Sequence, residues 1–238
     1  LLATEGGGQA TPPPFDAARS VSLSSAANAI SAISGDVAGD FELVNSADDG
    51  QVEQLNVGGA LTVNATGTLA LTSVKGGGDL TAKGKGITQT GTLTVTGPAG
   101  LSAATSMTLS NLGAGSITAE ADALSVSGLT VGADATLTSR AAALSLEDVD
   151  VGGDLQATGV GLGQTGSLDV DGHATLPGGT GGLAFHNVSA GGLTATGASI
   201  TQTGTARKGV PSGKRVSVRI TLGGCRIIHM KPNAAAIP

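Results

Sequence analysis

The chain has 238 residues, 40 of them glycine, and its only aromatic residues are three phenylalanines. An enzyme domain of this length normally buries several aromatic side chains, whereas a stack of repeated coils can fill a narrow core with aliphatic ones. Residues 1–206 carry five Lys/Arg against 18 Asp/Glu, a net charge of −13. This acidic balance argues against nucleic-acid binding by that part of the chain.

Residues 1–20 start with a Gly- and Pro-rich stretch (GGGQATPPP) and are predicted to be a linker or an irregular lead. The chain starts with Leu1 and shows no signal-peptide pattern, so we expect it to be an internal piece of a longer protein. No run approaches the roughly 18–20 apolar residues of a transmembrane helix. Cys225 is the only cysteine, which excludes a disulfide framework.

Residues 21–205 are predicted to form one repeat domain. The phrase GDLTAKGKGITQTGT (78–92) returns as GGLTATGASITQTGT (191–205), with 11 of 15 positions identical. A third copy starts at Gly153, 75 residues after the first. Both offsets lie within one residue of a multiple of 19, and a fixed period of this size indicates a solenoid.

Within each period, alternating apolar residues come in pairs such as Leu61/Val63 and Leu69/Leu71, separated by Gly or Asn. Such pairs indicate short, half-buried strands, and Gly or Asn permits the turns between them. The fold class is therefore predicted to be all-β, a right-handed parallel β-helix of roughly ten coils of about 19 residues, with three short strands per coil. Near-19 spacing predicts one inward row, consisting of Leu61, Leu80, Leu101, Ile117, Leu137, Leu155 and Leu193.

At Ala206 the repeat stops in mid-phrase, and residues 206–238 carry seven Lys/Arg and no acid. One interpretation is a basic tail that grips an anionic surface. The favoured interpretation is that this end is not native shaft sequence or is disordered, although Val216–Leu222 alternates like a strand that covers the last coil.

The motifs GGxLTV, GxITQTGxLTV and LALTSV resemble the shaft repeats of filamentous haemagglutinin-like proteins, which are large exported adhesins of Gram-negative bacteria. The resemblance covers roughly residues 21–205. It implies a β-helix, a secreted or cell-surface location, and attachment to host cell surfaces or extracellular glycans. It also implies that the full-length protein has an outer-membrane secretion partner.

Candidate chemistry is sparse, and we expect no catalytic, cofactor-binding or metal-binding residues. Asp171, His173 and His186 are the only grouping of an acid with imidazoles, and stacked coils could bring the two histidines together as a metal pair. The favoured interpretation is that both are solvated turn residues.

Glu147, Asp148 and Asp150 resemble the paired carboxylates of acid–base catalysis or cation binding. Because they alternate with Val149 and Val151, they are better explained as the polar face of a strand. Gln89, Gln164 and Gln202 recur at one coil position. We expect them to bond to turn backbones or to neighbouring coils rather than to a ligand.

Three functional classes remain. The favoured one is a non-enzymatic shaft segment of a secreted adhesin. The first alternative is a β-helix polysaccharide lyase or hydrolase, which the absence of Trp and Tyr disfavours. The second is an ice- or surface-binding solenoid with threonine rows on one face, formed by Thr62, Thr81, Thr94, Thr118, Thr136 and Thr194.

Overall fold

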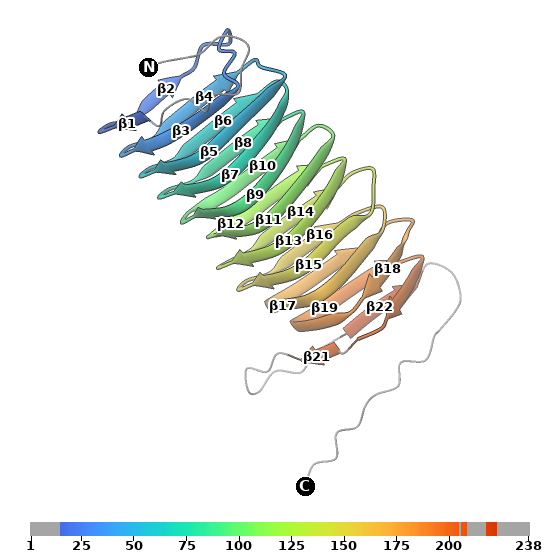
Figure 1. Ribbon diagram of the computed structural model, residues 1–238. Coiled ribbons are helices and arrows are strands. Elements are labelled where there is room, and N and C mark those ends of the chain that lie inside the picture. Colours follow the sequence, from blue (N-terminus) through green and yellow to red (C-terminus); the bar gives the residue numbers. More distant parts are fainter. Residues whose placement is uncertain (1–14, 205, 209–217, 223–238) are drawn as a thin grey trace.

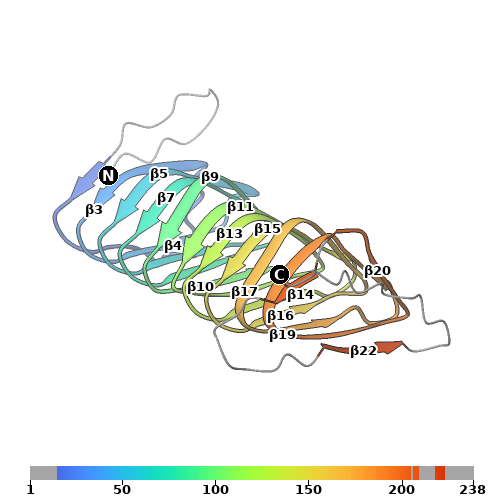
Figure 2. The same ribbon diagram turned by 90° about the horizontal axis from the view of Figure 1, so that it is seen from below.

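The computed structural model describes residues 15–204, 206–208 and 218–222. These residues form parallel strands that wind into a β-solenoid of about 10 turns, with coils of about 19 residues (Figure 1). The strands of successive coils lie side by side along the rod, with β3 near one end and β20 near the other (Figure 2). No helix in the described part of the chain is long and apolar enough to cross a membrane.

Each coil up to β16 contributes two strands, and from β3 onward one of them is short and the other longer. The short strands are β2 (Val21–Leu23), β4 (Phe41–Asn45), β6 (Leu61–Ala65), β8 (Leu80–Gly84), β10 (Pro98–Ala103), β12 (Ser116–Ala121), β14 (Ala135–Ser139) and β16 (Leu155–Thr158). The other series is β1 (Phe15–Ala17), β3 (Ala32–Val37), β5 (Asp49–Val57), β7 (Thr68–Gly76), β9 (Gly86–Val95), β11 (Ser106–Ala114), β13 (Ala123–Val131) and β15 (Leu144–Val151). The remaining strands are β17 (Leu162–Pro177), β18 (Gly182–Phe185), β19 (Asn187–Gly197), β20 (Ser199–Gln202), β21 (Ala206–Lys208) and β22 (Val218–Leu222).

The longer strands turn a corner in their middle. In β7, Leu69 and Leu71 are buried before the corner and Val74 after it, whereas Thr72 and Ser73 both stay outside the core. Ser73 has a φ of 54°, and Asn111 has the same value at the equivalent corner of β11. Each coil thus has three straight segments, as the alternating apolar pairs predicted. The handedness of the winding stays a prediction.

The short strands place two inward rows side by side. The first row contains five of the seven residues predicted for it, and its members are Phe41, Leu61, Leu80, Ala99, Ile117, Ala135, Leu155, Ala174 and Leu193. Leu101 and Leu137 are also buried, but they lie two residues further along, in the second row. The single row predicted from the spacing is therefore wrong at these two positions. Leu193 is only partly buried.

From β8 to β19, large and small side chains alternate between the two rows. β8 presents Leu80 and then Ala82, β10 presents Ala99 and then Leu101, and the exchange repeats in each later coil. From Leu101 to Leu176, each large side chain therefore lies between small ones in the coils before and after it, an arrangement that favours close packing. The structural unit is a pair of coils, and the 75- and 113-residue offsets in the sequence correspond to four and six coils.

The solenoid extends beyond residues 21–205 at both ends. β1 pairs with β3, although residues 1–20 were predicted as a lead. In the segment predicted as a tail, β21 and β22 both pair with β19. The strand expected within Val216–Leu222 is thus present as β22. The remainder of both predicted end segments, residues 1–14, 209–217 and 223–238, lies outside the described residues.

Candidate functional site

The three carboxylates singled out from the sequence are all exposed on β15, but they do not converge. Glu147 lies in the row before the corner, where Ser127 Oγ donates to its Oε2 at 3.2 Å. Asp150 lies in the row after the corner, beside Asp169 of the next coil. The alternation with the buried Val149 and Val151 expected for all three carboxylates holds for Asp150 alone, whereas Glu147 follows the buried Leu146 on the other side of the corner.

Asp148 is different, because it forms the corner itself. Its φ is 50°, and its Oδ1 accepts the backbone N–H of Ser167 at 3.0 Å. At the equivalent corner of the following coil stands Gly166, where a Cβ would collide with the Asp148 carboxylate. Asp148 therefore holds two coils together and belongs to the corner rather than to a strand face.

The two histidines lie in different rows and are not brought together. His173 is paired with Gly192 and directly precedes Ala174, which belongs to the first inward row. His186 directly follows Phe185, which ends β18 in the series of the longer strands. Both are exposed, and their ring nitrogens lie 2.9 Å and 3.4 Å from the hydroxyls of Thr194 and Thr203. Among the described residues, no group of three or more His, Cys, Asp or Glu could hold a metal ion.

The recurring glutamines make the structural bonds expected of them. Gln89 is fully buried; its Nε2 donates to the Gly91 carbonyl at 2.9 Å, and its Oε1 accepts the N–H of Ser110 in the next coil at 2.7 Å. Gln164 repeats this pattern with Gly166 and His186. The glutamines are separated by coils that carry an aliphatic or aromatic residue at this position, so they bond to backbones rather than to one another.

Aspartates before the short strands have a role that the sequence analysis missed. Asp40 Oδ1 accepts the N–H of Ala60 at 2.8 Å, and Asp134 Oδ1 accepts that of Asp154 at 2.8 Å. Asp154 in turn accepts the N–H of His173 at 2.7 Å. In each case the carboxylate bonds to the coil that follows it. The sequence signal is an Asp after Gly or Ala and directly before an apolar residue.

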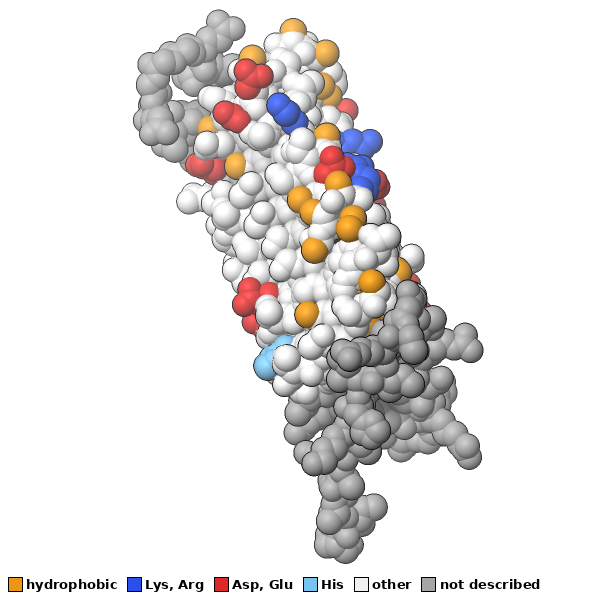
Figure 3. Space-filling model, turned by 90° about the vertical axis from the view of Figure 1, so that its right-hand side faces the viewer, with side chains coloured by type: hydrophobic (Ala, Val, Ile, Leu, Met, Phe, Trp, Pro, Cys, Tyr) orange, Lys and Arg blue, Asp and Glu red, His pale blue; other side chains and the backbone are white. Residues whose placement is uncertain are grey.

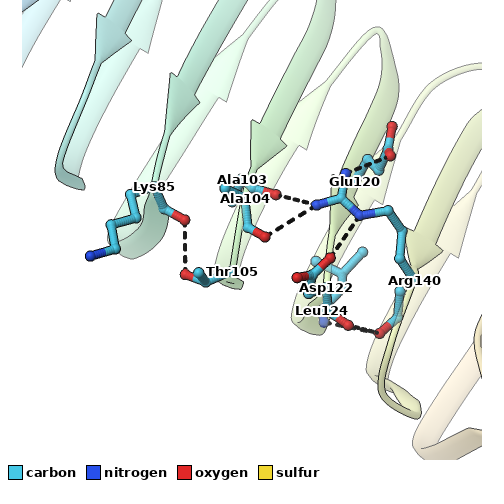
Figure 4. A network of polar contacts seen from close by, with 9 residues as sticks. Lys85, Ala103, Ala104, Thr105, Glu120, Asp122, Leu124 and Arg140 are labelled. Atoms are coloured by element: carbon cyan, nitrogen blue, oxygen red, sulfur yellow. Dashed lines mark hydrogen bonds and ion pairs between the residues drawn. The ribbon is translucent and has the colours of Figure 1, made fainter.

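One ionic cluster links three coils at the end of the short strands. The Arg140 guanidinium donates to Glu120 Oε1 at 2.8 Å and to Asp122 Oδ1 at 2.9 Å, and it reaches back to the Ala103 and Ala104 carbonyls at 2.9 and 3.3 Å (Figure 4). The hydrogen bonds to Glu120, and then those to Asp122, raise the pKa of Arg140. No feature of the sequence had singled out this residue.

Beside this cluster lies an open hollow of about 530 Å³, which we term the corner groove. Lys83 and Lys85 line it between Ala65 and Thr66 of the preceding coil and Ser102, Ala103 and Ala104 of the following coil, and Arg140 lies at the far end. Figure 3, which shows the side of the rod at the right of Figure 1, places Lys and Arg side chains close together on the upper half of that face. Apolar side chains also lie on this face, several of them close together below the Lys and Arg side chains.

The threonine row predicted for one face is present but interrupted. Thr62, Thr81, Thr118, Thr136 and Thr194 share one outward row on the short strands, which also contains Thr175. Gly100 and Gln156 break the row. Thr94 lies elsewhere, between Lys75 and Gly113 in the last segment of the longer strands, so its assignment to this row is wrong.

Residues 58–114 and 132–189 match a family described as repeats of unknown function (DUF5649). The two stretches together cover a little under half of the chain. Each spans three coils, and the second starts four coils after the first, so the matches follow the two-coil unit of the core. No curated protein and no solved structure matches the chain. The fold and the match thus define a β-solenoid repeat protein.

Proposed function

We propose that the chain is a structural shaft segment of a secreted bacterial surface adhesin, as the resemblance to filamentous haemagglutinin-like repeats implies. The observation that carries the proposal is the unbroken exchange of large and small core residues from β8 to β19. It builds a rod of stacked coils, the form expected of a shaft.

The outward surface suits weak, repeated contact. Its rows are dominated by short hydroxyl side chains, such as Thr88, Thr108, Ser125 and Ser145 on the longer strands. A hydroxyl both donates and accepts hydrogen bonds, as do the hydroxyls of a glycan. Many shallow contacts spread along a rod act through avidity rather than through one deep pocket. Host cell surfaces and extracellular glycans are therefore the proposed partners, and export through an outer-membrane partner belongs to the same proposal.

The test is retention of the labelled chain on cultured cell layers, as a monomer and as a streptavidin-linked tetramer. We expect weak retention of the monomer and much stronger retention of the tetramer. Absence of retention for both forms would contradict the proposal.

A shortened rod tests whether the contact is distributed. Deleting residues 155–192 removes one two-coil unit and joins Asp154 to Leu193, which keeps the alternation in the core because Leu155/Ala157 and Leu193/Ala195 are equivalent. Retention of the tetramer should fall in a graded way. Complete loss would indicate one local site within the deleted coils.

A further inference from the structure

Between residues 15 and 204, positive charge is scarce, and most of it is gathered at one place. Residues 15–204 contain five Lys/Arg, and three of them, Lys83, Lys85 and Arg140, border the corner groove. The other two, Arg19 and Lys75, do not line it. Against an acidic background, a local group of cations is the feature of the described surface that differs most from its surroundings.

Lys83 and Lys85 are exposed, and within the described part of the chain their ammonium groups form no ion pair. The carboxylates at the same corner, Glu120 and Asp122, are both already paired with Arg140. In Figure 4 the Lys85 ammonium group points away from this cluster, while its carbonyl accepts the Thr105 hydroxyl at 2.8 Å. The two lysines are therefore available to an external anion.

The floor of the groove is shallow because the corner residues are small. Gly84 has no side chain and the Ala103 side chain is buried in the core, so only the Ala104 methyl group and the Ser102 hydroxyl are presented here. Arg140 forms a fixed wall, since its guanidinium is held by the two carboxylates and by the Ala103 and Ala104 carbonyls. The volume of about 530 Å³ lies within the range of small-molecule sites, roughly 300–1,000 Å³.

We propose that the corner groove binds an acidic oligosaccharide through its carboxylate groups. Lys83 and Lys85 bind the carboxylates, Ser102 bonds to a ring hydroxyl, and the methyl group of Ala104 contacts the C–H face of a sugar ring. The proposal deepens the proposed function, on which it rests for its biological setting, by naming one place on the shaft and one class of glycan.

The experiment titrates the purified chain with trigalacturonic acid and follows binding by NMR chemical shifts. A neutral trisaccharide of galactose is the matched control ligand, and a sulfated galactose trisaccharide tests whether any anionic sugar is accepted. For an open surface groove we expect a dissociation constant on the order of millimolar, which weakens as NaCl is raised.

The variant Lys83→Gln/Lys85→Gln should weaken binding of trigalacturonic acid about tenfold, because it removes two exposed ionic contacts. The control Arg19→Gln/Lys75→Gln makes the same change in net charge away from the groove and should leave binding unchanged. Equal weakening by both variants, equal binding of the neutral sugar, or absence of binding by the unaltered chain overturns the proposal. Preferred binding of the sulfated sugar also overturns the assignment to carboxylates.

The proposed function and the groove can fail separately. If the tetramer is retained on cells but the unaltered chain does not bind trigalacturonic acid, the groove proposal fails and the adhesive shaft stands. If the chain binds this sugar through Lys83 and Lys85 but the tetramer is not retained, the reverse holds.

Discussion

The side-chain oxygen of Gln89 accepts the backbone N–H of Ser110 at 2.7 Å, where a backbone carbonyl would otherwise serve the ladder between coils. The reason lies in the length of the corner. Three residues lie between Gln89 and Leu93, but only two lie between Leu109 and Leu112 in the next coil, and the register between these strands shifts at this point. The glutamine amide thus satisfies the backbone groups that the extra residue displaces.

This relationship gives a compensation test. Gln89→Leu should lower the free energy of unfolding by about 1–3 kcal/mol, because the Ser110 N–H and the Gly91 carbonyl lose their partner, the buried Gln89 amide, at a partly buried corner. Deleting Thr92 as well should recover most of that loss, since the corner then has the length found in β11. Urea denaturation measures both, with deletion of Thr92 alone as the control. A double variant less stable than Gln89→Leu would show that the glutamine does not serve the extra residue.

The alternation of the core can be tested by exchanging two residues. Ala99→Leu/Leu101→Ala keeps composition and volume, but it places a leucine between Leu80 and Ile117, so that large side chains follow one another without a break from Phe41 to Ile117 in the first row. Overpacking there and a void in the second row should cost about 1–3 kcal/mol. Thermal unfolding measures the loss. Unchanged stability would mean that the order of large and small residues carries no packing information.

Gly163 and Gly166 lie three residues apart on β17 and form a matched pair for substitution. Gly166 has a φ of 65°, and a Cβ there would collide with the Asp148 carboxylate, whereas a Cβ on Gly163 would meet no atom within 4 Å. Gly166→Ala should therefore destabilise by about 1–3 kcal/mol. Gly163→Ala should change stability by less than about 0.5 kcal/mol. Equal losses of stability for the two variants in chemical denaturation would show that the corner geometry is not the cause.

The histidines should prove dispensable. His173→Ala and His186→Ala each remove an exposed ring that contacts one threonine hydroxyl, so we expect less than about 0.5 kcal/mol of change. Scanning calorimetry with and without added zinc is the measurement. A zinc-dependent rise in the melting temperature that either variant abolishes would restore the metal-pair hypothesis.

No cleavage of polysaccharide is expected from the purified chain, with or without added divalent metal. Glu147 and Asp150 lie in separate rows, and Asp148 is bonded to the neighbouring coil, so the three do not form an opposed acid and base. Assays of reducing ends and of unsaturated products on a polysaccharide panel provide the measurement. Turnover that Glu147→Gln or Asp150→Asn abolishes would favour the enzyme class.

The fold was predictable because its signals are local and repeated. Alternation such as Leu61-Thr62-Val63 fixes which side chains face inward, and recurrence of the ITQTG phrase fixes the coil as the unit. The position of a leucine within a row was less predictable. Leu101 and Leu137 were predicted in the wrong row, two residues away from their place, because a constant period of 19 does not distinguish coils that begin with Leu from coils that begin with Ala.

The surface features were harder to predict for a different physical reason. Arg140, Glu120 and Ala103 are 20 and 37 residues apart in sequence and meet only because coils stack at a corner. The aspartate bonds depend on the carboxylate pointing along the rod toward the next coil, which composition does not encode. Only the pattern Gly-Asp followed by an apolar residue, repeated at Asp40 and Asp154, could have indicated it.

The direction of these aspartate bonds has a consequence for the order of assembly. Asp40, Asp134 and Asp154 each supply an acceptor from an earlier coil to a donor in a later one, and Gln89 and Gln164 point the same way. When such a chain folds from its N-terminal end, each finished coil already displays the oxygen that its successor requires. The growing edge is then a template that orients the incoming segment before any of that segment's own core contacts have formed.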